Sequence, residues 1–292
     1  MYELCQVSDS SYYMNAPTKV GIVKLSENEV CLIDSGSDKD AGRKVRQILD
    51  KENWELKCIL NTHSHADHIG GNEYLQKQKN CKIYIPEEEL AFAEYPLMES
   101  AFLYGGFPPK DLRNKFLMAQ PSQCEALTEE TLPNGIASID LQGHTMAMTG
   151  FRTKDDVVYV GDAIWSKEIL EKYHISFLYD VEQTLLSLEK LKKMKAKKFV
   201  LAHGEPTESI GSLAQYNIDN IMETHDLILD FCKDKVTFEK LLQHIFLKYK
   251  IQMNFGQYVL IGSTVRSYLG YMKNKGLLDI SFENAEMFWH TV

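Results

Sequence analysis

The segment 61–68, Asn-Thr-His-Ser-His-Ala-Asp-His, places three imidazoles and a carboxylate within six residues. Histidine is scarce in this chain, with nine copies, and packing of a core gives no reason to gather three of them in one place. The apolar run 58–60 before the segment predicts the end of a buried strand, and residues 69–78 after it predict a helix. The segment therefore lies at the carboxyl end of a strand, and it supplies four candidate metal ligands: His63, His65, Asp67 and His68.

Further ligands are expected beyond this segment, because a divalent ion needs about four to six donors and one loop cannot complete two sites. The same pattern of an apolar strand, a ligand-type residue and a neighbouring glycine recurs at His144, Asp162 and His203. An earlier strand ends at Asp34, which we expect to anchor a ligand rather than to bind metal. These residues are expected to meet at one edge of the fold.

The order of these residues resembles the hallmark of the metallo-β-lactamase superfamily, an H-x-H-x-D-H loop followed by a lone His, a Gly-Asp and a final His. The resemblance covers roughly the first two-thirds of the chain, from residue 34 to residue 203. It implies an α/β fold, a four-layer αββα sandwich of two mixed sheets with helices outside and metals at one edge. It also implies a ligand assignment, in which one metal is held by His63, His65 and His144, a second by Asp67, His68 and His203, and Asp162 bridges both. Asp67 and Asp162 are the residues to which it assigns catalysis.

Two divalent ions about 3.5 to 4 Å apart can supply a bridging hydroxide near neutral pH and stabilise a developing oxyanion. Imidazole and carboxylate ligands suit zinc, and iron and manganese accept the same donors. We therefore expect a binuclear metal-dependent hydrolase acting on a small-molecule ester, thioester or lactone. The histidine at position 65 departs from the flavodiiron pattern, and the chain after His203 is too short for the inserted domain of the RNA-processing nucleases. The Thr-Met-Ala-Met sequence after His144 and the lack of a clear basic pair argue against glyoxalase II activity.

Two other classes of function stay open. The first is a metal-dependent nuclease that holds nucleic acid with its C-terminal part, which a basic stripe leading to the metals would favour. The second is a non-catalytic binding or oxygen-sensing protein, which redox-active iron would favour. The complete ligand set argues against loss of catalysis.

The chain is expected to divide into a catalytic domain, residues 1–215, and a helical domain, residues 216–292. Apolar spacing after residue 216 predicts helices over 217–232, 237–249 and 264–274, and a hairpin over 277–289. This pattern resembles a winged-helix-like appendage. Acidic and basic residues are equal in number from 220 onward, although the whole chain has a net charge of −9. Because nucleic-acid-binding domains are normally basic, we expect a structural or dimerising element, with a solvated cluster of charges at Arg266, Lys273 and Lys275.

Composition limits the remaining possibilities. No apolar stretch approaches the roughly 18 residues of a membrane span, and the N-terminus lacks a signal-like pattern, so we expect a cytoplasmic protein with no membrane partner. The six cysteines lack paired spacing and are expected to be reduced thiols. The basic run 190–198 is expected to end a helix that begins at Asp180.

Two features near the expected site have two interpretations each. The aromatic segment 102–109, Phe-Leu-Tyr-Gly-Gly-Phe-Pro-Pro, is either a lid over an apolar substrate or part of the core. His174 is either a proton donor to a leaving group or a surface side chain. A small-molecule substrate is the expected partner, nucleic acid is not expected, and a homodimer stays open.

Overall fold

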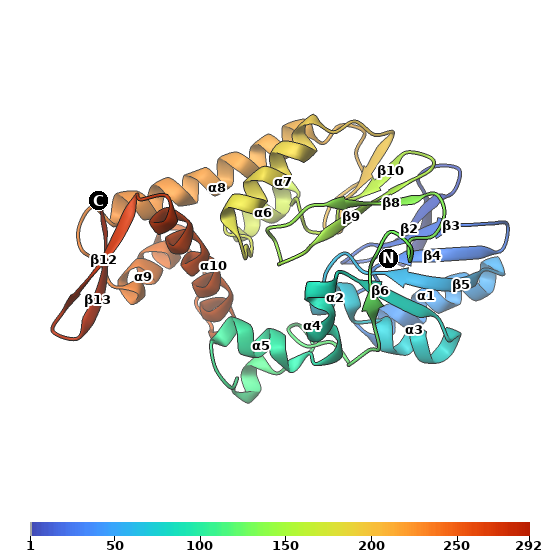
Figure 1. Cartoon of the computed structure of the whole chain (residues 1–292), viewed down its shortest axis with the longest axis horizontal. Coiled ribbons are helices and arrows are strands. Elements are labelled where there is room, and N and C mark those ends of the chain that lie inside the picture. The colour runs from blue at the N-terminus through green and yellow to red at the C-terminus, as the bar shows by residue number, and fades with distance from the viewer. Residues whose placement is uncertain (1) are drawn as a thin grey trace.

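A computed structural model describes residues 2–292, in which two β-sheets pack face to face between layers of helices (Figure 1). The first sheet has seven strands in chain order, antiparallel from β1 to β4 and parallel from β4 to β7. Its strands are β1 (Glu3–Gln6), β2 (Ser11–Asn15), β3 (Val20–Lys24), β4 (Glu29–Ile33), β5 (Glu55–Leu60), β6 (Lys82–Ile85) and β7 (Glu125–Ala126).

The second sheet has the order β11-β10-β9-β8, and it is also mixed because only β10 and β11 are parallel. Its strands are β8 (Ile136–Asp140), β9 (Thr149–Thr153), β10 (Val157–Tyr159) and β11 (Lys198–Val200). The core between the sheets joins Ile33 and Leu60 of the first sheet to Phe151 and Tyr159 of the second. The α/β sandwich expected from the sequence is therefore confirmed.

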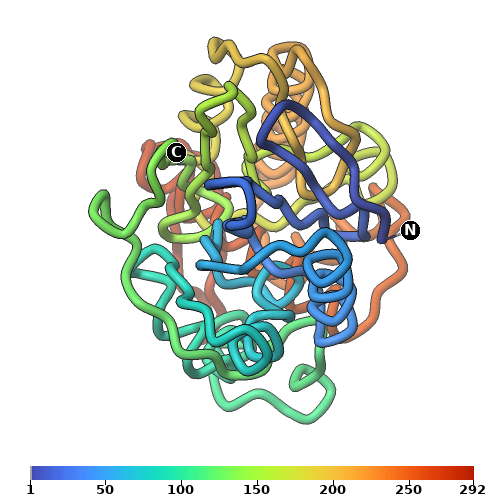
Figure 2. Tube along the Cα trace, turned by 90° about the vertical axis from the view of Figure 1, so that its right-hand side faces the viewer, coloured from blue at the N-terminus to red at the C-terminus, as the bar shows by residue number. Residues whose placement is uncertain are grey.

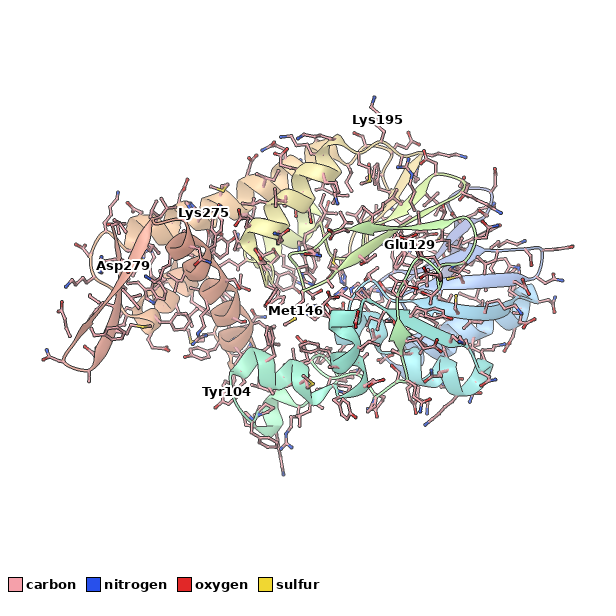
Figure 3. All side chains as sticks on the ribbon, viewed as in Figure 1. Tyr104, Glu129, Met146, Lys195, Lys275 and Asp279 are labelled. Atoms are coloured by element: carbon pink, nitrogen blue, oxygen red, sulfur yellow. The ribbon has the colours of Figure 1, made fainter. Side chains whose placement is uncertain are left out.

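Helices cover the outer face of each sheet. On the first sheet, α1 (Lys39–Glu52) turns Val45 and Leu49 inward, and it lies beside α3 (Asn72–Lys79). On the second sheet lie α6 (Lys167–Tyr173), α7 (Val181–Lys193) and α8 (Gly211–Phe231). Asp180 caps α7 as predicted, because its side chain accepts a hydrogen bond from the Gln183 amide. Lys195, in the basic run after α7, projects away from the molecule (Figure 3).

A helical insertion separates β6 from β7. It contains η1 (Glu87–Glu89), α4 (Leu90–Glu94), α5 (Leu97–Tyr104) and η2 (Lys110–Leu112). The α5 helix packs against α10 near the C-terminus, and both lie beside the edge of the sandwich where the strands β5 and β6 end (Figure 1).

The C-terminal part has the predicted elements: the end of α8, α9 (Phe238–Lys248), α10 (Phe255–Asn274) and the hairpin of β12 (Leu278–Glu283) and β13 (Glu286–Thr291). The prediction for the third helix was too short, because α10 begins at Phe255, where the Asn254 side chain caps it by accepting from the Gln257 amide. Figure 2, which looks down the long axis from the sheet end, shows this part behind the two sheets. The winged-helix classification stays a prediction.

The predicted boundary at 215/216 falls inside α8, which is continuous across it. One apolar cluster extends from the second sheet through α7 and α8 to α9 and α10. The division into two domains stays a prediction. The six cysteines are free thiols, as predicted. None of the helices within residues 2–292 is long and apolar enough to cross a membrane.

Candidate metal centre

The seven predicted ligands gather at one edge of the sandwich. Those of the first loop follow β5, where the short helix α2 (Ala66–Ile69) begins, and the later ones follow β8, β10 and β11. These strands run in the same direction within their sheets, so their carboxyl ends share an edge. The ligand atoms form two groups, each within 4.8 Å: His63, His65 and His144, and Asp67, His68, Asp162 and His203.

Asp162 lies between the two groups. Its Oδ1 is 3.2 Å from His68 Nε2 and 3.5 Å from His203 Nε2, whereas its Oδ2 is 3.6 Å from His144 Nε2. One carboxylate oxygen therefore faces each group, which is the geometry that a bridging ligand needs.

Four imidazoles are oriented through Nδ1, which leaves Nε2 directed into the centre. His68 donates from Nδ1 to Asp34 Oδ2 at 2.7 Å. His144 and His203 donate to the backbone carbonyls of Phe177 and Pro17 at 3.0 and 3.1 Å. Such contacts fix the tautomer and the ring orientation of a metal ligand.

His63 is oriented by a relay. The Thr62 hydroxyl donates to Asp34 Oδ2 at 2.9 Å, so its oxygen accepts from His63 Nδ1, also at 2.9 Å. Asp34 thus anchors two histidines, as expected from the sequence. His65 is turned the other way, with Nδ1 3.0 Å from His144 Nε2 and Nε2 3.5 Å from Glu99 Oε1.

Glycine is required beside one ligand. Gly143 precedes His144 with a φ of +124°, and a Cβ there would lie 2.2 Å from the Thr184 amide nitrogen. The loop can therefore lie against the start of α7, where the amides of Tyr179 and Asp180 donate to the Gly143 carbonyl.

Three buried atoms at the centre have no hydrogen-bond partner within residues 2–292: His63 Nε2, His68 Nε2 and Asp162 Oδ1. Buried polar atoms are rarely left without a partner, because such an atom has lost water and gained nothing. Divalent cations held by the two ligand groups would satisfy them, His63 in one group and His68 with Asp162 in the other. The residues therefore fit divalent metal.

Burial lowers the pKa of His63 well below its usual value, and burial with the neighbouring His144 lowers the pKa of His65 to about 3. Burial raises the pKa of Asp162, but His203 and His68 outweigh it and hold this pKa at about 2. Burial also lowers the pKa of His68, yet the surrounding carboxylates raise it well above its usual value. Asp162 is thus ionised, and a divalent cation held by these residues would compete with the proton on His68.

Two larger cavities and a small pocket of about 20 Å³ beside His65 and Glu99 adjoin the centre within residues 2–292. One of about 170 Å³ lies directly over the ligands, lined by His65, Ala66, Asp67, Glu99, Phe116, Leu117, His144, Asp162, Trp165, Phe177 and Leu260. The other, of about 330 Å³, is reached past Asp67 and His203 and is mostly apolar. Among residues 2–292, no lysine or arginine lines either cavity.

His174 and the aromatic segment 102–109 each had two interpretations from the sequence. The His174 ring stacks on Tyr249 with centroids 5.1 Å apart, and His174 lines neither cavity. Segment 102–109 lines neither of the two larger cavities, but its Phe102 lines the small pocket beside His65 and Glu99. Its Leu103 is buried against α10, whereas its Phe107 is 74% exposed.

Sequence reasoning missed several residues of the site. Glu99 contacts His65, and Phe177 and Leu260 line both cavities. Phe177 follows a short helix and Leu260 lies inside a long one, so neither carries a local signal. Glu99 stands in an acidic segment whose other glutamates are mostly exposed, and its burial could not be read from the sequence.

The comparisons with known proteins agree with this geometry. The family profile described as the metallo-beta-lactamase superfamily matches residues 16–203. A hydroxyacylglutathione hydrolase of Rhodopseudomonas palustris is 43% identical over 54 residues, 18% of this chain and 21% of that protein. The chain thus spans only about a fifth of that relative's length. The "Probable metallo-hydrolase YflN" of Bacillus subtilis is 26% identical over 60% of this chain and 75% of its own length.

The fold similarity extends over the C-terminal part. A beta-lactamase domain protein from Burkholderia ambifaria superposes with a TM-score of 0.77 at 14% sequence identity, covering 99% of this chain and 94% of that one. The family profile alone covers well over half of the chain. The chain therefore belongs to the metallo-β-lactamase superfamily.

Proposed function

We propose that the protein is a binuclear metal-dependent hydrolase of small-molecule esters, thioesters or lactones. The observation that carries this proposal is the compartment over the ligand atoms, which adjoins a mostly apolar chamber lined by no lysine or arginine of residues 2–292. The superfamily typically binds divalent metals, often zinc, and the two ligand groups are suited to one ion each, with Asp162 between them.

Divalent ions bound there would supply a hydroxide nucleophile near neutral pH and polarise the carbonyl under attack. The side chains around the ligand atoms position the reacting groups and provide a carboxylate. Asp67 lines both cavities, its Oδ2 lies 3.1 Å from His203 Nε2, and it accepts from the Thr18 hydroxyl at 2.9 Å. Its carboxylate is thus fixed where it can accept a proton from attacking water. Trp165, stacked on His203 at 5.3 Å, covers the centre and excludes bulk water.

The lining of the cavities favours an acyl substrate over a phosphodiester. Phosphate recognition relies on lysine and arginine, and neither lines these cavities within the described residues 2–292. Several relatives are named hydroxyacylglutathione hydrolase, which supports the thioester class. The absence of cations in the lining argues against glutathione itself as the recognised part.

The test is hydrolysis by the full-length protein reconstituted with zinc or manganese. A p-nitrophenyl ester and an acyl thioester are expected to be hydrolysed much faster than bis-p-nitrophenyl phosphate. His65→Ala is expected to lower the rate at least about a hundredfold, since even partners of metal ligands contribute 10- to 100-fold. His244→Ala, which removes an imidazole stacked on Phe231 away from the centre, is the matched control. Preferential turnover of the phosphodiester would favour the nuclease alternative.

A further inference from the structure

We propose that α10 forms one wall of an acyl-binding chamber, so that the C-terminal part selects substrates with an unbranched apolar acyl chain of about six to ten carbons. This inference rests on the proposed function and names the substrate class of that site. It assigns the C-terminal part a role beyond packing.

One face of α10 borders the chamber. Gln257, Leu260, Ile261 and Thr264 line it, and their spacing of three, four and seven residues places them on the same side of a helix. The opposite wall is made by α6 and the loop after it, which contribute Ile169, Leu170, Tyr173, Ile175, Ser176 and Phe177. The chamber therefore exists only where the C-terminal helix meets the sandwich.

The chamber adjoins the reaction centre. Four residues line both it and the compartment over the ligands: Asp67, Trp165, Phe177 and Leu260. A scissile carbonyl held at the ligand atoms can therefore direct its acyl chain past Trp165 into the chamber. The leaving group then remains on the side of the exposed Phe116, whose side chain lines the smaller compartment.

The size and chemistry of the chamber determine which acyl chains of a substrate it can hold. Its volume is about 330 Å³. A water molecule occupies about 30 Å³ and a methylene group is similar in size, so there is room for about ten methylene-sized groups. Its lining is mostly aliphatic and aromatic, and the acidic and basic side chains that residues 2–292 contribute to it are Asp67 and His203, at the reaction centre. Each methylene buried there is expected to strengthen binding about fourfold.

The wall is fixed in place by contacts on the other faces of α10. Val259 packs in a small apolar cluster with Leu103 and Leu112 of the insertion. The Tyr258 hydroxyl donates to Glu239 of α9 at 2.8 Å. The chamber is therefore formed before substrate binds, as is usual for small-molecule sites.

The test compares substrates with acyl chains of different length, hydrolysed by the metal-loaded full-length protein. For p-nitrophenyl esters from acetate to dodecanoate, kcat/KM is expected to rise to an optimum between hexanoate and decanoate. Leu260→Trp fills the chamber and is expected to lower the ratio of kcat/KM for octanoate over acetate at least tenfold. Leu260→Ala is expected to move the optimum to longer chains. Leu247→Trp, on an exposed position of α9, is the matched control and should leave the ratio unchanged.

A binding measurement separates this inference from the proposed function. Isothermal titration calorimetry should show octanoate binding more tightly than butyrate, and Leu260→Trp should weaken octanoate binding at least tenfold. If Leu260→Trp does not fold, Gln257→Trp fills the chamber from the same face. Length-dependent binding without ester hydrolysis would overturn the proposed function and support the chamber. Two results would overturn the inference that the chamber binds the acyl chain and leave the proposed function intact. One is hydrolysis whose rate does not depend on acyl-chain length. The other is a ratio of kcat/KM for octanoate over acetate that both tryptophan variants leave unchanged.

Discussion

At the residue scale, Asp34 organises more of the centre than any ligand does. Its backbone is left-handed, with a φ of 61°, a conformation that asparagine and aspartate tolerate better than most residues. Its carboxylate accepts hydrogen bonds from the Thr62 amide, the Thr62 hydroxyl and His68 Nδ1. Local backbone strain is therefore retained where it orients two imidazoles.

Asp34→Ala is expected to leave a folded protein whose metal affinity is about 10 to 100 times weaker, because His68 and His63 lose the contacts that orient them. Competition with a chromogenic chelator measures this affinity. Asp9→Ala, at an exposed carboxylate, is the control. An unchanged affinity would show that the imidazoles are held by packing alone.

The position of Asp162 leads to a prediction of how many metal ions each chain binds. The intact protein purified without chelator is expected to contain about two transition-metal ions per chain, and Asp162→Ala should lose most of both, since one carboxylate faces both ligand groups. Elemental analysis gives the answer directly. Full occupancy in the variant would rule out a bridging role.

Asp155 links stability to pH. Burial raises its pKa, but hydrogen bonds from Thr153, Ser10 and Ser11 outweigh this and hold the pKa well below its usual value of about 4. A depressed folded-state pKa adds stability above the unfolded-state pKa, and that stability is lost as the pH falls through the folded-state value.

Asp155→Asn is therefore expected to lower the free energy of unfolding at pH 7 by about 1 kcal/mol, a modest amount because the group is partly exposed. Urea unfolding at several pH values should show the difference from the native protein shrinking below about pH 4. A difference independent of pH would contradict the role of its charge.

The sequence predicted which residues gather at this edge because each lies after a strand: four in one loop rich in histidine, and His144, Asp162 and His203 each near a glycine. It did not predict Glu99, Phe177 or Leu260. Those residues act through contacts with elements distant in the chain, and no spacing within their own segments marks them.

At the scale of elements, α8 connects the C-terminal part to the centre. Buried Asn217 accepts from the Trp165 amide at 3.0 Å and donates to the Trp165 carbonyl at 2.9 Å. Trp165 in turn stacks on His203. A helix predicted to be structural therefore holds the aromatic cover of the metal centre.

Asn217→Ala is expected to lower the free energy of unfolding by about 1 to 3 kcal/mol, since it leaves buried backbone groups without partners. Metal content should not change, because every ligand remains, whereas the near-ultraviolet circular dichroism of the tryptophans should. Asn220→Ala, three residues along α8 and only partly buried, is the control. Unchanged stability together with an unchanged spectrum would show that Asn217 does not hold Trp165 in place.

The start of α10 was predicted wrongly from the apolar spacing of the sequence. The predicted start of the third C-terminal helix at 264 followed the clearest apolar spacing, but α10 begins at Phe255. Its first turns carry Gly256 and Gln257 and face a cavity as well as a core. Mixed exposure of this kind hides the helical period. Gln257, Leu260 and Ile261, which line the chamber, therefore fell outside the predicted helix, whereas Thr264 is its first residue.

At the scale of the whole molecule, the layered fold was predictable because the superfamily resemblance fixes the order of strands and ligands. The relation of the C-terminal part to the centre was not. It depends on one apolar cluster that joins the second sheet to α8, α9 and α10, and on the small cluster that joins the insertion to α10. These contacts unite segments far apart in the chain.

The last prediction concerns nucleic acid. The cluster of charges expected on the C-terminal part is paired: the Arg266 guanidinium lies 3.9 Å from the centroid of the Phe238 ring, Lys273 Nζ is 2.6 Å from Asp279 Oδ1, and Lys275 Nζ is 2.6 Å from Glu182 Oε1. Lys275 and Asp279 lie on the C-terminal part, away from the sheets (Figure 3). Carboxylates therefore neutralise Lys273 and Lys275, whereas the ring contact leaves the charge of Arg266 in place.

RNA and DNA are therefore expected to bind more weakly than about 10⁻⁴ M at about 0.15 M salt, outside the usual range of non-specific binding. Reversing the charges of Arg266, Lys273 and Lys275 together should change ester turnover less than twofold, because exposed ion pairs contribute little to stability. Fluorescence anisotropy over a salt series measures the affinity. Submicromolar binding that falls steeply with salt, and a slope flattened by the triple reversal, would instead make the C-terminal part a nucleic-acid arm and favour the nuclease.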